Sequence, residues 1–310
     1  MLKEAPNRTF NMLSIDGGGL RGIYPAHLLL RIQEELDLNY QDYFDLVIGT
    51  STGSIIAAAI ACNIDLNEII KMYEEYGPKI FPDNGKFGFF CSKFSEGKKI
   101  LGEQLENVLG EIRFKDIKTP SLIIPSTNIC EGTVFVFKSK YSSEFVRDPE
   151  ILVRDAVLAS CSAPTYFDPT RVDEYLLSDG GLWANNPTML GYVDAQRRFS
   201  KKADEIKILS IGTGTEIINY ERISEPRLWG LLTGWERSKF LDLIFSLQSQ
   251  SIHNYLSLLF FQETNKYLRL NFESNKKLAL DNTKTMQDFK SIADSTFTYQ
   301  SSRIINFFNS

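Results

Sequence analysis

The sequence has few of the residues that enzymes most often use to bind metals or to transfer protons. Only two histidines, His27 and His253, occur among 310 residues. No histidine pair and no cluster of carboxylates has the spacing of metal ligands. We therefore expect no metal and no other cofactor, and a proton acceptor has to be sought among few side chains.

Long apolar runs and closely spaced cysteines are also absent. No stretch of 18 or more apolar residues occurs, so no transmembrane helix is expected, and the amino terminus lacks the apolar core of a signal peptide. The cysteines lie far apart in the sequence, at Cys62, Cys91, Cys130 and Cys161. This spacing predicts free thiols rather than a zinc knuckle or a disulfide framework. The sequence thus predicts a soluble, cytoplasmic protein.

Charge and composition are those of a globular protein. The net charge is −5, and 43% of the residues are hydrophobic. An excess of acidic residues argues against broad binding of DNA or RNA. We expect a single domain over residues 1–310, with a core at about 8–215 and a helical carboxy-terminal extension at 216–310.

Two successive strand–turn–helix patterns indicate the fold class. An apolar run at 10–15 is followed by a glycine loop and by helical spacing at 26–36, and residues 46–61 repeat the arrangement. Such units predict a parallel sheet covered by helices. Further apolar strands are expected at 121–127, 133–139, 174–177 and 206–214. The sequence therefore predicts an α/β fold.

The second of these units contains a candidate nucleophile. Ser51 lies between Gly49 and Gly53, directly after an apolar strand and directly before a helix rich in small residues. A sharp strand-to-helix turn requires glycine on both sides of the serine, since a Cβ at either position would collide with neighbouring backbone. The pattern predicts that the Ser51 hydroxyl is exposed at the carboxyl edge of the sheet.

The glycine loop of the first unit is a candidate oxyanion hole. Gly17, Gly18 and Gly19 follow Asp16, and Arg21 lies within the same loop. Successive unhindered N–H groups at the start of a helix form a nest for negative charge. In an acyl-transfer enzyme that charge is the tetrahedral oxyanion.

The same loop also has a rival interpretation. Gly17, Gly19 and Gly22 fit the GxGxxG pattern of dinucleotide-binding proteins. Three acids lie near the distance expected of a ribose-binding residue: Glu34, Glu35 and Asp37. A dinucleotide-dependent enzyme is therefore a second hypothesis, and the Ser51 turn favours the first.

Asp179 is the preferred base for Ser51. A strand delivers it to a glycine turn, whereas His253 lies in a segment with helical spacing and His27 lies more than a turn beyond the glycine loop. A serine–aspartate–histidine triad with His253 remains an alternative in chain order. A carboxylate with a pKa near 4 is a weak base, so the site should either raise the pKa of Asp179 by partial burial or orient the carboxylate very well. We expect Asp16 to hold the glycine loop by accepting backbone hydrogen bonds rather than to act in catalysis.

Taken together, these motifs resemble the patatin-like phospholipases. The matching segments are 16–22, 49–53, 162–167, 179–181 and 184–187, and the likeness covers residues 11 to about 215. The resemblance implies a three-layer α/β/α fold with a mainly parallel sheet. It also implies a Ser51–Asp179 dyad without histidine, oxyanion-hole amides from Gly18 and Gly19, and Arg21 supporting the loop.

The resemblance further implies that the protein hydrolyses acyl esters of membrane glycerophospholipids at the inner face of a membrane, without calcium. Bacterial proteins similar to it include anti-phage effectors that a cyclic nucleotide activates, so a cyclic nucleotide and a second copy of the chain are candidate partners. A catalytically silent lipid-binding or storage protein on the same fold is the alternative.

Two aromatic stretches are candidates for peripheral contact with the membrane, with ordinary core packing as the competing interpretation. One is residues 228–235, which include two tryptophans. In the other, residues 81–94, phenylalanines alternate with lysines that an anionic leaflet would attract. Its members are Phe81, Lys86, Phe87, Phe89, Phe90, Lys93 and Phe94.

Overall fold

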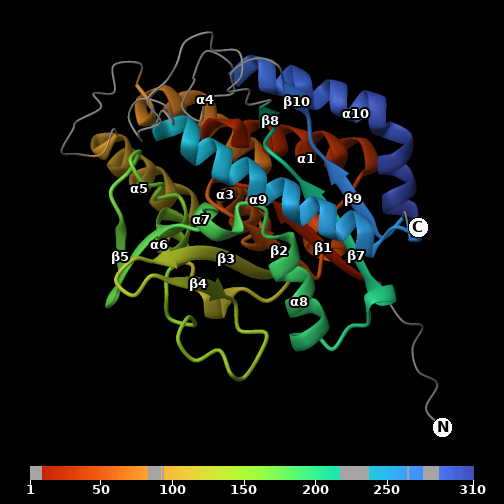
Figure 1. Ribbon diagram of the computed structural model, residues 1–310, viewed down its shortest axis with the longest axis horizontal. Coiled ribbons are helices and arrows are strands. Elements are labelled where there is room, and N and C mark those ends of the chain that lie inside the picture. The colour runs from red at the N-terminus through yellow and green to blue at the C-terminus, as the bar shows by residue number, and fades with distance from the viewer. Residues whose placement is uncertain (1–8, 83–91, 93, 217–236, 264, 275–285) are drawn as a thin grey trace, which may run out of the picture.

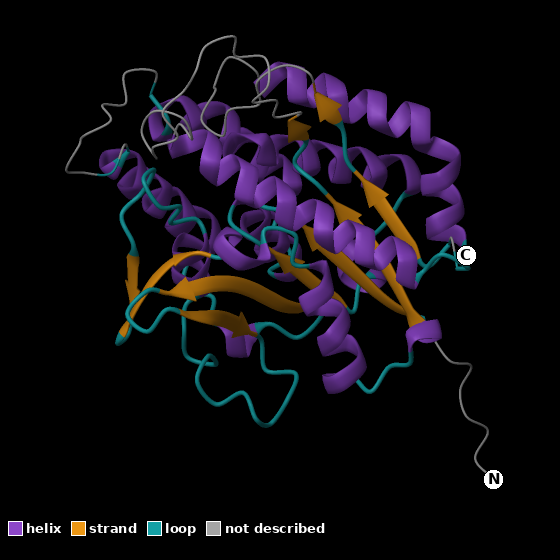
Figure 2. Cartoon of the chain, viewed as in Figure 1, coloured by secondary structure: helices purple, strands orange, loops and turns teal. Residues whose placement is uncertain are grey.

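A mixed β-sheet forms the centre of the computed structural model, and helices pack on both of its faces (Figure 1). The structure describes residues 9–82, 92, 94–216, 237–263, 265–274 and 286–310. Figure 2 shows the strands crossing the middle of the molecule between helices. The described residues contain no helix with the length and apolarity needed to cross a bilayer.

The sheet has the strand order β5-β6-β3-β2-β1-β7-β9, and β4 pairs with β3. The strands β3, β2, β1, β7 and β9 run parallel to one another, whereas β4, β5 and β6 are added in antiparallel pairs. A separate short pair joins β8 to β10. The bounds are β1 Phe10–Ile15, β2 Leu46–Gly49, β3 Ser121–Asn128, β4 Thr133–Lys138, β5 Thr170–Val172, β6 Tyr175–Asp179, β7 Ile206–Ile211, β8 Thr215–Glu216, β9 Tyr267–Leu270 and β10 Glu273–Ser274.

The helices divide between the two faces of the sheet. One layer contains α1, α3, α4, α5, α6 and α10, and the other contains α7, α8 and α9. Their bounds are α1 Ile23–Leu36, α2 Tyr40–Tyr43, α3 Thr52–Ala61, α4 Leu66–Ile80, α5 Ser95–Leu109, α6 Val153–Ser160, α7 Gly181–Ala184, α8 Thr188–Arg198, α9 Arg237–Leu259 and α10 Met286–Asn309. Short 3₁₀ turns occur at Gly19–Gly22, Phe114–Asp116 and Ala203–Glu205.

The alternation of side chains along β1 explains why both faces are covered. Leu13 and Ile15 belong to one buried cluster, whereas Phe10 and Met12 belong to a second cluster on the other side of the sheet. Successive residues of a strand point to opposite faces, so a strand with apolar side chains on both faces needs helices on both sides. The three-layer α/β/α arrangement that the family resemblance implied is confirmed.

The carboxy-terminal segment is more than the helical extension that we expected for residues 216–310. Within it, β9 pairs in parallel with β7 and forms an edge of the central sheet. The strand has only four residues between helical stretches, so its local pattern did not distinguish it from its surroundings. This segment therefore helps to build the sheet and, as described below, the site.

Most of the two aromatic stretches proposed for membrane contact lies outside the described residues, as does Cys91. Phe81 and Phe94, at the two ends of the stretch 81–94, are buried: their rings pack 5.3 Å apart between centroids, and Phe81 also packs on Phe167. For these two side chains core packing was the correct interpretation. The other three cysteines are free thiols, as predicted.

Candidate active site

Ser51 lies in a strained turn between β2 and α3. Its backbone has φ 52° and ψ −126°, a conformation that non-glycine residues rarely adopt. A Cβ on Gly53 would lie 2.5 Å from the carbonyl oxygen of Ile15, and a Cβ on Gly49 would overlap the carbonyl of Gly53. The two flanking glycines are therefore needed because the chain crosses itself at both positions.

Hydrogen bonds hold this turn in place. The amide of Ser51 donates to the hydroxyl of Ser160 at 2.9 Å, and that hydroxyl donates to the carbonyl of Pro125 at 2.6 Å. The carbonyl of Ser51 accepts a hydrogen bond from the amide of Ser54. A strained residue persists only where its surroundings fix it in this way, which is common at functional sites.

Asp179 lies at the end of β6 and meets Ser51, although the two are far apart in the sequence. The carboxyl is 1% exposed, accepts a hydrogen bond from the amide of Gly181 at 2.6 Å and interacts with the side chain of Ser51. Burial raises the pKa of Asp179 from 3.8 to about 7, whereas the Gly181 hydrogen bond and the interaction with Ser51 lower it. A pKa close to neutral makes the carboxylate an effective proton acceptor at physiological pH.

The glycine loop lies against the same serine. A Cβ on Gly17 would be 3.2 Å from the Ser51 Cβ, and Gly19 lines the same small pocket as Ser51. The Gly17 amide, however, donates to the carbonyl of Asn185 at 3.0 Å. Our assignment of Gly17 as an oxyanion-hole donor is therefore wrong, because its N–H is already used to hold the loop.

The amides of Gly18 and Gly19 remain as the candidate donors. In the described part of the chain neither N–H has a hydrogen-bond acceptor. The Gly17 carbonyl accepts from the Thr213 hydroxyl at 2.7 Å, and the Gly18 carbonyl accepts from the amide and the Nε of Arg21. Because C=O and N–H point in opposite directions across a trans peptide, these bonds direct both amides away from Thr213 and Arg21.

Asp16 is anchored by a residue that sequence reasoning missed. Both oxygens of its buried carboxylate bind the guanidinium of Arg269 in β9, at 2.8 and 2.6 Å. Arg269 also donates to the hydroxyl of Ser210 at 2.8 Å. A bidentate pair of this kind fixes geometry as well as charge. Asp16 therefore holds the base of the glycine loop through an arginine from the other end of the chain, rather than through the backbone hydrogen bonds that we expected.

The two histidines are occupied elsewhere. His27 pairs with Asp294 of α10 at 3.1 Å, and His253 hydrogen-bonds the hydroxyl of Tyr267 at 3.0 Å. Neither has a contact with Ser51 or Asp179 among the described residues. The same residues contain no group of three or more histidine, cysteine, aspartate or glutamate side chains placed to hold a metal ion.

A narrow, mainly apolar pocket begins at Ser51. Its volume is about 40 Å³, and its walls come from the turn, α4 and the segments packed on them. The apolar side chains that line it include Leu20, Ile55, Met72, Ile80 and Phe167. A pocket of this chemistry suits a hydrocarbon chain attached to an ester carbonyl at Ser51.

Comparison with known proteins agrees with this geometry. Residues 13–192 match the family described as patatin-like phospholipase, a region that contains the Ser51 turn, the glycine loop and Asp179. The chain belongs to the patatin-like phospholipase family. It is accordingly a lipid acyl hydrolase.

Individual relatives come from bacteria and plants. A protein of Escherichia coli named cGAMP-activated phospholipase is 31% identical over 80% of this chain and 74% of its own length. Patatin-like protein 1 of Oryza sativa is 28% identical over 86% of this chain and 75% of its own. Among solved structures, VipD of Legionella pneumophila aligns with a TM-score of 0.47 and 13% identity, over 94% of this chain and 67% of VipD.

The raised pKa of Asp179 predicts how activity of this patatin-like hydrolase depends on pH. Only the ionised carboxylate accepts the Ser51 proton, so kcat/KM should rise with pH through about 7, whereas an ordinary aspartate would be fully ionised well below that. Initial rates on a soluble ester between pH 4 and 9 measure this profile. A flat profile above pH 5 would show that Asp179 keeps an ordinary pKa.

Proposed function

We propose that the protein is a phospholipase A type enzyme that cleaves acyl esters of membrane glycerophospholipids through an acyl-enzyme on Ser51. The observation that carries the proposal is the interaction of the Ser51 side chain with the buried Asp179 carboxylate, beside the glycine loop. A nucleophile, a base and an anion-binding pair of amides are the parts that acyl transfer requires.

Each of these groups has a defined role in this reaction. Asp179 accepts the proton of Ser51 while the Ser51 oxygen attacks the ester carbonyl, and Gly18 and Gly19 donate hydrogen bonds to the resulting oxyanion. One such donor commonly contributes about 2.7–4 kcal/mol of transition-state stabilisation. Asp179 then gives the proton to the leaving lysophospholipid alcohol. Water then attacks the acyl-enzyme while the same carboxylate accepts its proton, and Asp179 returns that proton to the Ser51 oxygen as the fatty acid leaves.

The pocket at Ser51 supports an acyl chain as the substrate group. Its lining is apolar, but about 40 Å³ is room for only a few water-sized groups. The walls therefore have to separate before a long acyl chain can enter. Met72 of α4 is an unbranched side chain that can change rotamer at low cost, so this wall is suited to that movement.

Control by a cyclic nucleotide is the second half of the proposal. Support comes from the bacterial relatives, which include three proteins named cGAMP-activated phospholipase. A hydrolase that opens its acyl pocket only when activated would not digest the membrane of its own cell. We accordingly propose a cytoplasmic antiviral effector that acts at the inner face of the membrane.

Vesicles of bacterial phospholipids, incubated with the purified protein with and without cGAMP, test this function. We expect free fatty acid and lysophospholipid to appear, faster with cGAMP, and neither to appear with Ser51→Ala. Mass spectrometry of the lipids measures both products. Binding of phospholipid without any release of fatty acid would contradict the proposal and favour a silent lipid-binding protein.

A further inference from the structure

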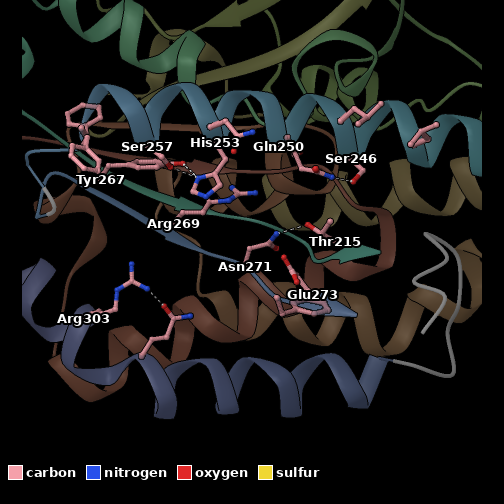
Figure 3. Close-up of a pocket in the computed structure, with 18 residues that line it drawn as sticks. Thr215, Ser246, Gln250, His253, Ser257, Tyr267, Arg269, Asn271, Glu273 and Arg303 are labelled. Carbon is pink, nitrogen blue, oxygen red and sulfur yellow. Dashed lines mark hydrogen bonds between the residues drawn. The ribbon is translucent and has the colours of Figure 1, made fainter. Parts of the chain in front are cut away.

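A cavity of about 1070 Å³ lies apart from the Ser51 pocket, and the two have no lining residue in common among the residues that the structure describes. Figure 3 shows its walls: His253 and Gln250 come from α9, Arg269 from β9, and Arg303 from α10. Small-molecule sites in proteins usually measure about 300–1,000 Å³. This cavity is therefore large enough for a ligand with two ring systems, and larger than one nucleotide needs.

The chemistry of the walls suits nucleobases. Aromatic rings are supplied by Phe260, Phe261, Tyr267 and Phe272, of which Phe261 is 76% exposed. Exposed aromatic rings stack on bases of any kind. Side-chain amides and a carboxylate are also present, and these groups hydrogen-bond the edges of purines. They are Gln250, Asn254, Asn271, Gln300 and Glu273.

Arg303 is placed to bind a phosphodiester. Its exposed guanidinium donates to the amide oxygen of Gln300 at 2.8 Å and keeps further N–H groups for a ligand. The other arginine of the lining, Arg269, is bound by both oxygens of Asp16. Among the described lining residues Arg303 is thus the cation that an anionic ligand can reach.

The cavity walls also hold the glycine loop of the active site. Arg269 lines the cavity and binds Asp16 at the base of that loop. Ser249, another lining residue, accepts a hydrogen bond from the Asn185 side chain at 3.0 Å, and the Asn185 carbonyl accepts from the amide of Gly17. A shift of α9 or β9 around a ligand would therefore move both supports of the loop.

A third connection runs through the residue after β9. The oxygen of the Asn271 side chain accepts from the amide of Gly214 at 2.9 Å, and its nitrogen donates to the hydroxyl of Thr215. Thr213, one residue before Gly214, donates to the carbonyl of Gly17. Figure 3 shows Asn271 and Thr215 side by side on the cavity wall.

We propose that this cavity binds a cyclic dinucleotide and that its occupancy repositions the glycine loop beside Ser51. The inference rests on the proposed function and names the site at which the activator acts. Arg303 holds a phosphodiester, the exposed ring of Phe261 stacks on a base, and the three hydrogen-bonded connections carry the change to the loop.

Isothermal titration of cGAMP into the full-length protein tests the site without measuring catalysis. Arg303→Glu should weaken binding on the order of ten-fold or more, because a charge-assisted hydrogen bond is replaced by repulsion. Gln250→Ala is a second, uncharged change in the same wall and should also weaken binding. Arg197→Glu in α8 is the matched control, since Arg197 is exposed and outside the cavity.

The possible results distinguish a failure of the proposed binding site from a failure of the proposed function. If cGAMP binds and both cavity variants lose affinity while Arg197→Glu does not, the site is supported. If cGAMP speeds fatty acid release but binds the cavity variants unchanged, the activator acts elsewhere, so the inference fails while the proposed function stands. No binding of cGAMP to the wild-type protein overturns the inference whatever the hydrolytic activity.

The coupling to the loop has its own measurement. The rate at which a fluorophosphonate labels Ser51 should increase when cGAMP is bound, and this increase should be lost in Arg303→Glu at concentrations that saturate the wild-type protein. An unchanged labelling rate in the presence of bound cGAMP would overturn the proposed movement of the loop.

Discussion

Asp179→Asn should lower kcat for ester hydrolysis by about 10³-fold, since a general base typically contributes 10²–10⁴-fold. Asparagine has the shape of the native side chain and can still accept the hydrogen bond from the Gly181 amide, but it cannot take a proton from Ser51. Steady-state rates on a soluble ester measure the loss. Because the defect lies in proton transfer, KM should change far less than kcat.

The matched control is His253→Ala, which should leave the rate nearly unchanged. Histidine is the usual partner of a catalytic serine. Here, however, the His253 ring is hydrogen-bonded to the hydroxyl of Tyr267 in the lining of the large cavity. If His253→Ala destroyed activity and Asp179→Asn did not, the result would contradict the Ser51–Asp179 dyad and support a triad that includes His253.

Asp179→Asn should also stabilise the protein above neutral pH. Burial raises the pKa of Asp179 to about 7, so ionising it in the folded state costs free energy as pH rises from about 4 through 7. Removing the charge should therefore raise the free energy of unfolding at pH 8 by up to about 4 kcal/mol and leave it nearly unchanged at pH 4. Denaturant unfolding at the two pH values measures the difference.

Arg269→Leu should have the largest effect on folding. It leaves the Asp16 carboxylate buried without its bidentate partner, and removing one member of a buried pair commonly costs about 3–5 kcal/mol. Activity should fall as well, because Asp16 holds the base of the glycine loop. Chemical denaturation gives the stability, and hydrolysis under folding conditions gives the activity.

Two further variants test whether the loss of stability comes from breaking the buried pair of Asp16 and Arg269. Lys115→Leu breaks an exposed pair with Glu150 and should cost no more than about 1 kcal/mol. Asp16→Asn combined with Arg269→Leu should recover part of the stability lost by Arg269→Leu alone, since no buried charge is left unpaired. A double variant as unstable as the sum of its parts would contradict the pairing.

Local patterns were sufficient to predict the main parts of the fold. The apolar runs of β1 and β2, each followed by glycine and then by helical spacing, specify strand, turn and helix within a short stretch of sequence. Gly49 and Gly53 carried the strongest signal because backbone crossing leaves no room for a side chain. Asp179 was predictable for a similar reason: the Cβ of a residue other than glycine at position 180 would overlap the Pro125 carbonyl.

The supports of the site could not be predicted in the same way. Arg269 lies in a short strand near the carboxy terminus, and its partner Asp16 lies near the amino terminus, so no local spacing relates them. The Gly17 amide was misassigned because a run of glycines does not show which N–H groups are already bound. Asn185 binds the loop through its backbone carbonyl, an interaction that is independent of side-chain type.

Fluorophosphonate labelling followed by peptide mass spectrometry tests the central claim most directly. If a buried carboxylate activates the serine of the strained turn, the label should be found on Ser51, not on the neighbouring Ser54, and Asp179→Asn should greatly slow its attachment. A label on a different residue, or hydrolysis that survives Ser51→Ala, would contradict the mechanism.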